Sequence, residues 1–222
     1  MNIEKYIDHT LLKATTTVEE VRRLCAEAIR YNFAAVCIPP LYVKIAKNLL
    51  EKTDIKTATV IGFPLGYSAI ESKIAEIVLA LVDGVDEIDM VANIAAIKNG
   101  DWSFIANEIN TIFPIVKNKE KCIKVIIETG VLTDEEIIKC CELYGAAEVD
   151  FLKTSTGFAQ KGASVDAVKL MRKFLPASVG IKASGGIKNY TFALELIAAG
   201  ANRLGTSSGV EIIMEQTKSA MA

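Results

Sequence analysis

Short apolar runs rich in β-branched residues recur along the chain, and longer segments with helical periodicity separate them. Most positions in these runs are apolar and charges are isolated, which is typical of strands in a parallel sheet whose two faces are both covered. The pattern predicts seven strands, at residues 35–38, 57–61, 87–91, 123–128, 149–154, 179–183 and 203–205, and a weaker eighth at 6–12.

The segments between the strands carry signals for the start and end of helices. A hydroxyl residue followed by Glu three positions later, the pattern of a capping box, occurs at Thr17, Ser68 and Thr133. Glycine adopts the left-handed conformation of a helix C-terminus at the least cost, and it stands at the end of the helical pattern at Gly84, Gly145 and Gly200. Strands and helices therefore alternate along the chain.

This alternation fits two architectures, an open doubly wound sheet and a closed (β/α)8 barrel. The strands are evenly spaced, and no glycine-rich nucleotide-binding turn follows the first of them, so the pattern favours the barrel. A length of 222 residues suits one domain. We therefore expect residues 1–222 to form a single α/β domain, a (β/α)8 TIM barrel.

Composition argues against several functional classes. The chain has 25 Lys and Arg against 27 Asp and Glu, so it lacks the basic excess of a nucleic-acid-binding protein. No stretch is apolar enough for a membrane span, and the first residues lack the apolar core of a signal peptide. Five cysteines without a CxxC pair and one histidine offer few metal ligands. We expect a cytoplasmic protein with no nucleic-acid, membrane or metal partner.

Lysines on three predicted strands are candidates for chemistry. The active site of a barrel lies at the carboxyl ends of the strands, and Lys153 and Lys182 occupy equivalent places on consecutive strands. Loss of water and a neighbouring ammonium both lower the pKa of an amine, and a neutral amine is a nucleophile towards aldehydes and ketones. A strand-end lysine can instead extend into solvent without a chemical role. Lys124, a third strand lysine, is an alternative nucleophile.

Asp89 and three loops complete the set of candidates. A buried carboxylate near ammonium groups either relays protons or forms a structural ion pair, and the sequence leaves both interpretations of Asp89 open. Loops of small residues let backbone N–H groups approach a phosphate, and such loops follow the last three strands, at residues 154–157, 184–186 and 206–209.

Seven separated motifs closely resemble the deoxyribose-phosphate aldolase family. They are IDHTLL (7–12), VCIP (36–39), VIGFPLG (60–66), DEIDMV (86–91), KVIIET (124–129), FLKTSTGF (151–158) and GIKASGGI (180–187). The resemblance implies a metal-free, cytosolic class I aldolase on a (β/α)8 barrel, with no cofactor besides a lysine Schiff base. Such an enzyme cleaves 2-deoxy-D-ribose 5-phosphate reversibly to D-glyceraldehyde 3-phosphate and acetaldehyde, in the catabolism of deoxyribose phosphate.

The resemblance also assigns roles to residues. The Schiff-base lysine of the family falls on Lys153, its second lysine on Lys182 and its catalytic aspartate on Asp89, while Asp8 lies near the second lysine and could hold its charge. The positions implied for substrate and phosphate binding are Thr154, Gly157, Gly185, Gly186, Ser207 and Ser208. Family members are often dimers, so the resemblance suggests a homodimer that acts on small sugar phosphates and aldehydes.

The chain departs from the family at two places, and two rival functions stay open. Some members have a lysine where this chain has Phe158, and some end in a tyrosine that aids proton transfer, whereas this chain ends KSAMA. One rival is another Schiff-base lyase of the same fold, such as a ketose-phosphate aldolase. The other is a protein that binds a phosphorylated metabolite and has lost the reaction.

Overall fold

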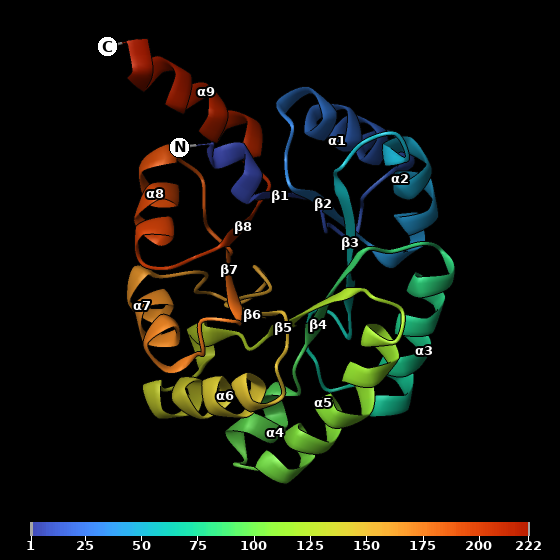
Figure 1. Ribbon diagram of the computed structural model, residues 1–222, viewed down its shortest axis with the longest axis vertical. Coiled ribbons are helices and arrows are strands. Elements are labelled where there is room, and N and C mark those ends of the chain that lie inside the picture. Colours follow the sequence, from blue (N-terminus) through green and yellow to red (C-terminus); the bar gives the residue numbers. More distant parts are fainter. Residues whose placement is uncertain (1, 222) are drawn as a thin grey trace.

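Eight parallel strands close into a barrel in the computed structural model of the chain, which describes residues 2–221 and their side chains as far as Lys218 (Figure 1). Met1 and Ala222, the ends of the predicted domain, lie outside the described residues. The strands are β1 (Ile7–Thr10), β2 (Ala35–Ile38), β3 (Lys56–Ile61), β4 (Glu87–Val91), β5 (Cys122–Ile126), β6 (Phe151–Lys153), β7 (Gly180–Ser184) and β8 (Arg203–Thr206). Each pairs with the next, and β8 pairs with β1, which confirms the barrel and excludes the open sheet.

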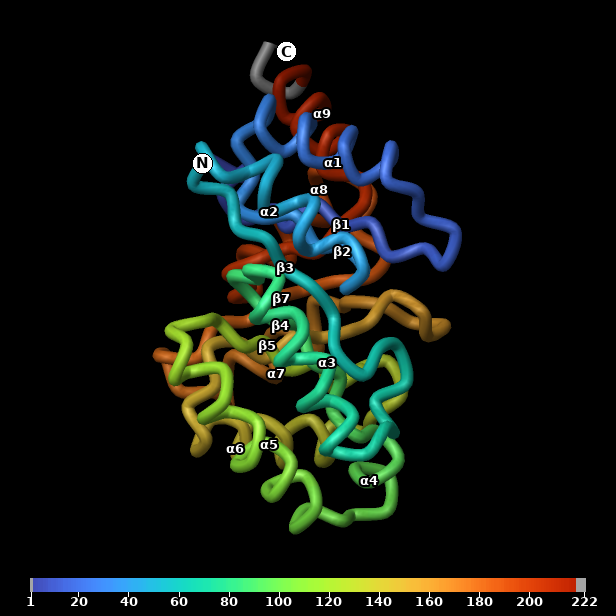
Figure 2. Tube along the Cα trace, turned by 90° about the vertical axis from the view of Figure 1, so that its right-hand side faces the viewer, coloured from blue at the N-terminus to red at the C-terminus, as the bar shows by residue number. Residues whose placement is uncertain are grey.

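Helices surround the barrel and cover its outer face (Figure 1). One main helix follows each strand, in the order α1 (Val18–Tyr31), α2 (Val43–Leu50), α3 (Ile70–Val82), α5 (Trp102–Lys117), α6 (Asp134–Ala146), α7 (Val165–Phe174), α8 (Tyr190–Ala198) and α9 (Gly209–Met221). Shorter pieces are α4 (Ile94–Lys98), η1 (Ile3–Tyr6), η2 (Pro40–Tyr42) and η3 (Thr129–Val131). Figure 2 shows α9 beside α1, so the last helix closes the ring against the first.

Two of the three predicted capping boxes are present. The hydroxyls of Thr17 and Thr133 accept backbone hydrogen bonds at the starts of α1 and α6. In turn, the side chains of Glu20 and Glu136 accept the backbone N–H of these two threonines. The prediction at Ser68 was wrong, because α3 begins later, at Ile70, with Ala69 as its N-cap and no side-chain cap. A local signal of this kind is worth about 1 kcal/mol, which packing of the helix can override.

Gly84 and Gly200 have the positive φ predicted for residues that end helices, but Gly145 does not. Gly145 lies inside α6, and the left-handed residue after that helix is Glu148, with a φ of 53°. A Cβ atom at position 145 would lie 2.9 Å from Cδ of Pro176. Glycine is therefore needed there for the close approach of two segments and not for the turn of the backbone.

An apolar layer between the strands and the helices, called the shell below, forms the main core. Side chains alternate between the two faces of a strand, and those that face outwards, such as Ile88, Ile123, Leu152 and Ile181, are fully buried against helix residues. The other set of alternating side chains points into the interior of the barrel, called the lumen. The closure of the sheet therefore brings residues from all parts of the sequence together in the lumen.

Candidate active site

Charged side chains from six strands meet in the lumen. Asp89 lies beside Lys124 in the strand register, and Lys153 lies beside Lys182. The full set, called the lumen network, is Asp8, Glu87, Asp89, Lys124, Lys153, Lys182 and Arg203. It contains three carboxylates and four basic groups, so it is neutral when one basic group has lost its proton. Because burial of unbalanced charge is costly, this composition favours one uncharged lysine.

Asp89 lies at the centre of the lumen network. Its Oδ2 atom is 2.7 Å from Lys153 Nζ and 2.6 Å from Lys182 Nζ, and its Oδ1 atom is 3.0 Å from Lys124 Nζ. Burial raises the pKa of Asp89, but the three lysines outweigh burial and hold that pKa well below its usual range. Asp89 is therefore a carboxylate at neutral pH, and it holds the three lysines in place.

Two of these lysines have a second carboxylate close by and stay protonated. Lys182 Nζ is 2.5 Å from Asp8, and Lys124 Nζ is 2.5 Å from Glu87. Burial lowers the pKa of each amine, but the carboxylates outweigh burial and raise both pKa values above the ordinary range. The predicted proximity of Asp8 to Lys182 is present, and Asp8 also accepts a hydrogen bond of 2.6 Å from Arg203.

Lys153 has the opposite electrostatic balance. Burial lowers its pKa, the carboxylate of Asp89 opposes this effect, and the ammonium of Lys182 lowers the pKa further, so the net direction is downwards. The side chain is 3 % exposed, which contradicts the alternative of a lysine extending into solvent. Of the three lumen lysines, Lys153 is the one with a lowered pKa, and the charge balance of the network favours one such amine.

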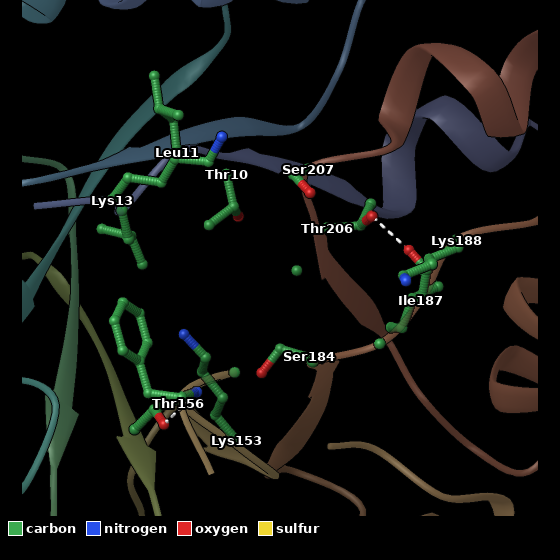
Figure 3. Close-up of a pocket in the computed structure, with 16 residues that line it drawn as sticks. Thr10, Leu11, Lys13, Lys153, Thr156, Ser184, Ile187, Lys188, Thr206 and Ser207 are labelled. Atoms are coloured by element: carbon green, nitrogen blue, oxygen red, sulfur yellow. Dashed lines mark hydrogen bonds between the residues drawn. The ribbon is translucent and has the colours of Figure 1, made fainter. Parts of the chain in front are cut away.

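A cavity of about 330 Å³ opens at the carboxyl ends of the strands, and the amine of Lys153 points into it (Figure 3). Lys124, Lys182 and Asp89 lie below the cavity and do not line it. A small electrophile in the cavity therefore meets Lys153, whereas the other two lysines act on it only through Asp89 or through the charge of the network.

Four of the six predicted phosphate-loop residues line the cavity. Gly157, Gly185 and Gly186 have positive φ values of 86°, 87° and 78°, and Ser207 lies near the start of α9. Thr154 and Ser208 do not line it. The hydroxyl of Thr154 is buried and accepts the N–H of Ser184, and Ser208 donates its N–H to the hydroxyl of Thr206. Through these hydrogen bonds, Thr154 and Ser208 stabilise the loops that form the cavity wall.

Sequence reasoning missed several residues of the cavity wall. Lys13 and Lys188 bring two exposed cations to it, and Thr10 adds a hydroxyl. Lys188 directly follows the Gly-Gly-Ile motif after β7, and Lys13 directly follows the first motif, so nearness to the motifs was the available signal. Phe158, 58 % exposed, contacts Phe63 edge to face with ring centroids 5.2 Å apart and forms an apolar part of the wall.

Other chemical candidates lie elsewhere or lack reactivity. His9 contacts Glu27 at 2.7 Å on the outer side of β1, away from the lumen. Burial raises the pKa of the Cys37 thiol, which keeps it protonated. Within residues 2–221, no group of three or more His, Cys, Asp or Glu side chains is arranged to hold a metal ion. No helix in the same described range is long and apolar enough to cross a membrane.

Comparison with known proteins matches the sequence of this chain to one family. Residues 3–214 match the DeoC/LacD family of aldolases. The chain is 53 % identical over 215 residues to the deoxyribose-phosphate aldolase of Thermococcus gammatolerans, covering 96 % of both chains. It is 50 % identical over 222 residues to the enzyme of the same name from Caldanaerobacter subterraneus, covering 100 % of this chain and 96 % of the relative.

Solved structures agree with the sequence match. The structure of a deoxyribose phosphate aldolase from Aeropyrum pernix, described as tetrameric, superposes with a TM-score of 0.90 at 32 % identity, over 99 % of this chain and 92 % of that one. The family match spans every strand of the barrel and every residue of the lumen network. The chain therefore belongs to the DeoC/LacD family of aldolases.

Proposed function

We propose that this protein is a deoxyribose-phosphate aldolase with Lys153 as its Schiff-base residue. It cleaves 2-deoxy-D-ribose 5-phosphate reversibly to D-glyceraldehyde 3-phosphate and acetaldehyde, and needs no metal or cofactor. Family membership and the names of the relatives support the reaction class. The observation that carries the assignment of the nucleophile is the position of Lys153 on the cavity wall with a lowered pKa, above two lysines whose pKa values are raised.

The geometry suggests how the covalent step runs. The neutral amine of Lys153 adds to C1 of the open-chain sugar, and loss of water gives an iminium ion. Asp89 stabilises the new positive charge, because its carboxylate already lies 2.7 Å from Lys153 Nζ. Lys182 stays protonated beside Asp8, so it keeps lowering the pKa of Lys153 between turnovers.

The iminium ion then acts as an electron sink for cleavage. The C3 hydroxyl loses its proton to Asp89 through a water, the C2–C3 bond breaks, and its electron pair forms an enamine on Lys153 as glyceraldehyde 3-phosphate leaves. Protonation of the enamine at C2 restores the iminium ion, with Lys182 and Asp89 as the nearest acid–base pair. Hydrolysis by one water releases acetaldehyde and the free amine.

The phosphate end of the substrate fits the opposite side of the cavity. Gly157, Gly185 and Gly186 allow close approach of backbone N–H groups, and Ser207 adds the N-terminal region of α9. Thr154 and Ser208 support these loops from behind. Lys13 and Lys188 supply positive charge at the wall, where Phe158 replaces the lysine of some family members.

Acetaldehyde trapping with sodium borohydride tests the proposal. Reduction is expected to fix one ethyl group on Lys153, read by intact and peptide mass spectrometry, and Lys153→Ala is expected to abolish both adduct and turnover. An adduct on Lys124 or Lys182 would overturn the assigned roles. A folded protein that forms an adduct only with a ketose phosphate would be the rival lyase, and one that forms none would be the rival binding protein.

The same proposal includes a homodimer in the cytoplasm, in which each subunit is a single barrel domain. The outer face of α3 exposes Val78, Leu79 and Val82 at 44 %, 67 % and 79 %, which is an apolar stripe that a second copy would cover. The five cysteines are all unpaired, as is usual in a reducing compartment. Val82→Asp is expected to convert the dimer to a monomer, measured by light scattering; an unchanged mass would place the interface elsewhere.

A further inference from the structure

A buried carboxylate that the proposed reaction does not use lies behind the loop that follows Lys153. Glu128, two residues beyond the end of β5, is 6 % exposed and has a left-handed backbone with a φ of 56°. This conformation is uncommon for a residue with a long side chain, and it persists where the surrounding structure fixes it. It also explains why β5 ends at Ile126 although the apolar pattern predicts a strand to residue 128.

The carboxylate of Glu128 binds Thr156 at two points. The N–H of Thr156 donates to Oε1 at 3.3 Å and to Oε2 at 3.2 Å, and the hydroxyl of Thr156 donates a short hydrogen bond to Oε2. The same hydroxyl accepts the N–H of Phe158 at 3.0 Å. Burial raises the pKa of Glu128, and these hydrogen bonds oppose that rise because they stabilise the carboxylate. Through them Glu128 fixes the backbone of Gly157 and Phe158, which both line the cavity.

The loop after β6 is also wedged between its neighbours. On the β5 side, a Cβ atom at Gly130 would lie 2.4 Å from the carbonyl oxygen of Lys161. On the β7 side, a Cβ atom at Gly162 would lie 2.2 Å from the carbonyl oxygen of Gly185. Neither glycine has room for a Cβ atom, so the backbones pack closely there, and a shift of the loop away from Glu128 passes to Gly185, which also lines the cavity.

We propose that Glu128 is a positioning residue that sets the affinity of the cavity for the phosphate end of the substrate. It acts through Thr156 on Gly157 and Phe158, and through the wedged loop on Gly185. The inference rests on the proposed function, which it deepens by separating the residue that tunes phosphate binding from those that form the Schiff base.

The charge of Glu128 alone predicts the opposite effect. A carboxylate near a phosphate repels it, so removal of that charge strengthens phosphate binding unless the carboxylate also organises the site. The glutamine side chain has nearly the same shape but is neutral, and it offers one acceptor oxygen to the two donors of Thr156. Whether phosphate affinity falls or rises in Glu128→Gln therefore distinguishes the positioning role from simple repulsion.

Steady-state kinetics with two sugars provide the main test. For Glu128→Gln we expect kcat/KM with 2-deoxyribose 5-phosphate to fall roughly tenfold, mainly through KM, because a hydrogen bond to a charged group is lost. With 2-deoxyribose, which has no phosphate, kcat/KM is expected to stay unchanged, and so is the acetaldehyde adduct on Lys153. Glu142→Gln on the exposed face of α6 is the matched control and is expected to leave kcat/KM unchanged with both sugars.

Variants of Thr156 test the same contact from the other side. Thr156→Val removes the hydroxyl and is expected to reproduce the selective loss of kcat/KM with 2-deoxyribose 5-phosphate. Thr156→Ser keeps the hydroxyl and is expected to retain the kcat/KM of the unmodified protein. The double variant Glu128→Gln/Thr156→Val should lose no more than the larger single effect, because both changes break one contact. Titration with inorganic phosphate is expected to show weaker binding in Glu128→Gln than in the unmodified protein.

Each alternative outcome contradicts the inference in a recognisable way. Equal losses with both sugars would make Glu128 part of the chemistry or of general stability, and tighter phosphate binding would leave only repulsion. If Glu128→Gln does not fold, an unchanged ratio of kcat/KM between the phosphorylated and the unphosphorylated sugar in Thr156→Val would overturn the positioning role. Failure of the unmodified protein to form the adduct would overturn the proposed function separately, while the phosphate titration would still test Glu128.

Discussion

On β5, Ile123 and Val125 face the shell, and Lys124 between them faces the lumen. The same alternation on β7 separates Ile181 from Lys182, so one set of strands supports two very different environments. In the shell, burial of apolar surface contributes about 25 cal/mol per Å² to stability. In the lumen, each buried charge costs free energy that its partners only offset. The lumen is therefore where the chain accepts a cost in stability, and there the chemistry lies.

The shell contains an informative exception, an ion pair between α3 and α5. Lys73 Nζ lies 2.6 Å from Glu108 and donates to the carbonyl oxygen of Val91 at 2.8 Å, and both charged side chains are fully buried. Burial lowers the pKa of Lys73 despite the opposing carboxylate, just as it lowers that of Lys153. A lowered lysine pKa therefore does not mark a nucleophile by itself. Access to a cavity distinguishes Lys153 from Lys73.

Among the variants that test the contrast between shell and lumen, Lys182→Met is expected to have the largest effect. The amine of Lys153 reacts when neutral, so adduct formation rises with pH through the pKa of Lys153. The Lys182 ammonium lowers that pKa, and its removal should shift the pH profile of acetaldehyde adduct formation towards higher pH. Turnover should fall about 10²–10⁴-fold through loss of an acid–base group. The trapping rate measured across a pH series checks the shift, and steady-state turnover of 2-deoxyribose 5-phosphate checks the loss of rate.

Lys169→Met on the exposed face of α7 is the matched control for this experiment, since it removes one ammonium outside the lumen network. Circular dichroism must show that Lys182→Met is folded, because the variant leaves Asp8 with Arg203 and the more distant Lys124 as its remaining cations. A folded variant with an unshifted profile would show that burial alone, and not the second ammonium, activates Lys153.

Strand alternation explains how much of this site could be predicted from the sequence. A period of two places Lys153 and Lys182 at matching positions of adjacent strands, so the strand pattern alone identifies both. The charge partners could not be predicted in this way, because barrel closure sets them: Asp8 and Arg203 lie 195 positions apart in the chain, yet they are hydrogen-bonded. Glu87 joins the network in the same way, through Arg203 and Lys124.

Loops were the other limit of sequence reasoning. Lys13 and Lys188 lie beyond the ends of strands, where no period indicates which way a side chain points, and they were missed although both line the cavity. Thr154 is a predicted substrate-binding residue; its hydroxyl accepts the N–H of Ser184, and it does not line the cavity. Small residues near a phosphate site can serve either role, and their direction is fixed by packing between neighbouring loops.

The smallest expected effect on chemistry comes from replacing the shell ion pair. Lys73→Met alone leaves Glu108 buried without its cation and should cost about 3–5 kcal/mol in the free energy of unfolding, measured by urea denaturation. Lys73→Met/Glu108→Leu removes both charges, and such apolar replacements are often neutral or stabilising. Acetaldehyde adduct formation by the double variant should match that of the unmodified protein. A large loss of trapping in this stable variant would mean that the hydrogen bond from Lys73 to the end of β4 also positions Asp89, so that shell and lumen would no longer be separable in function.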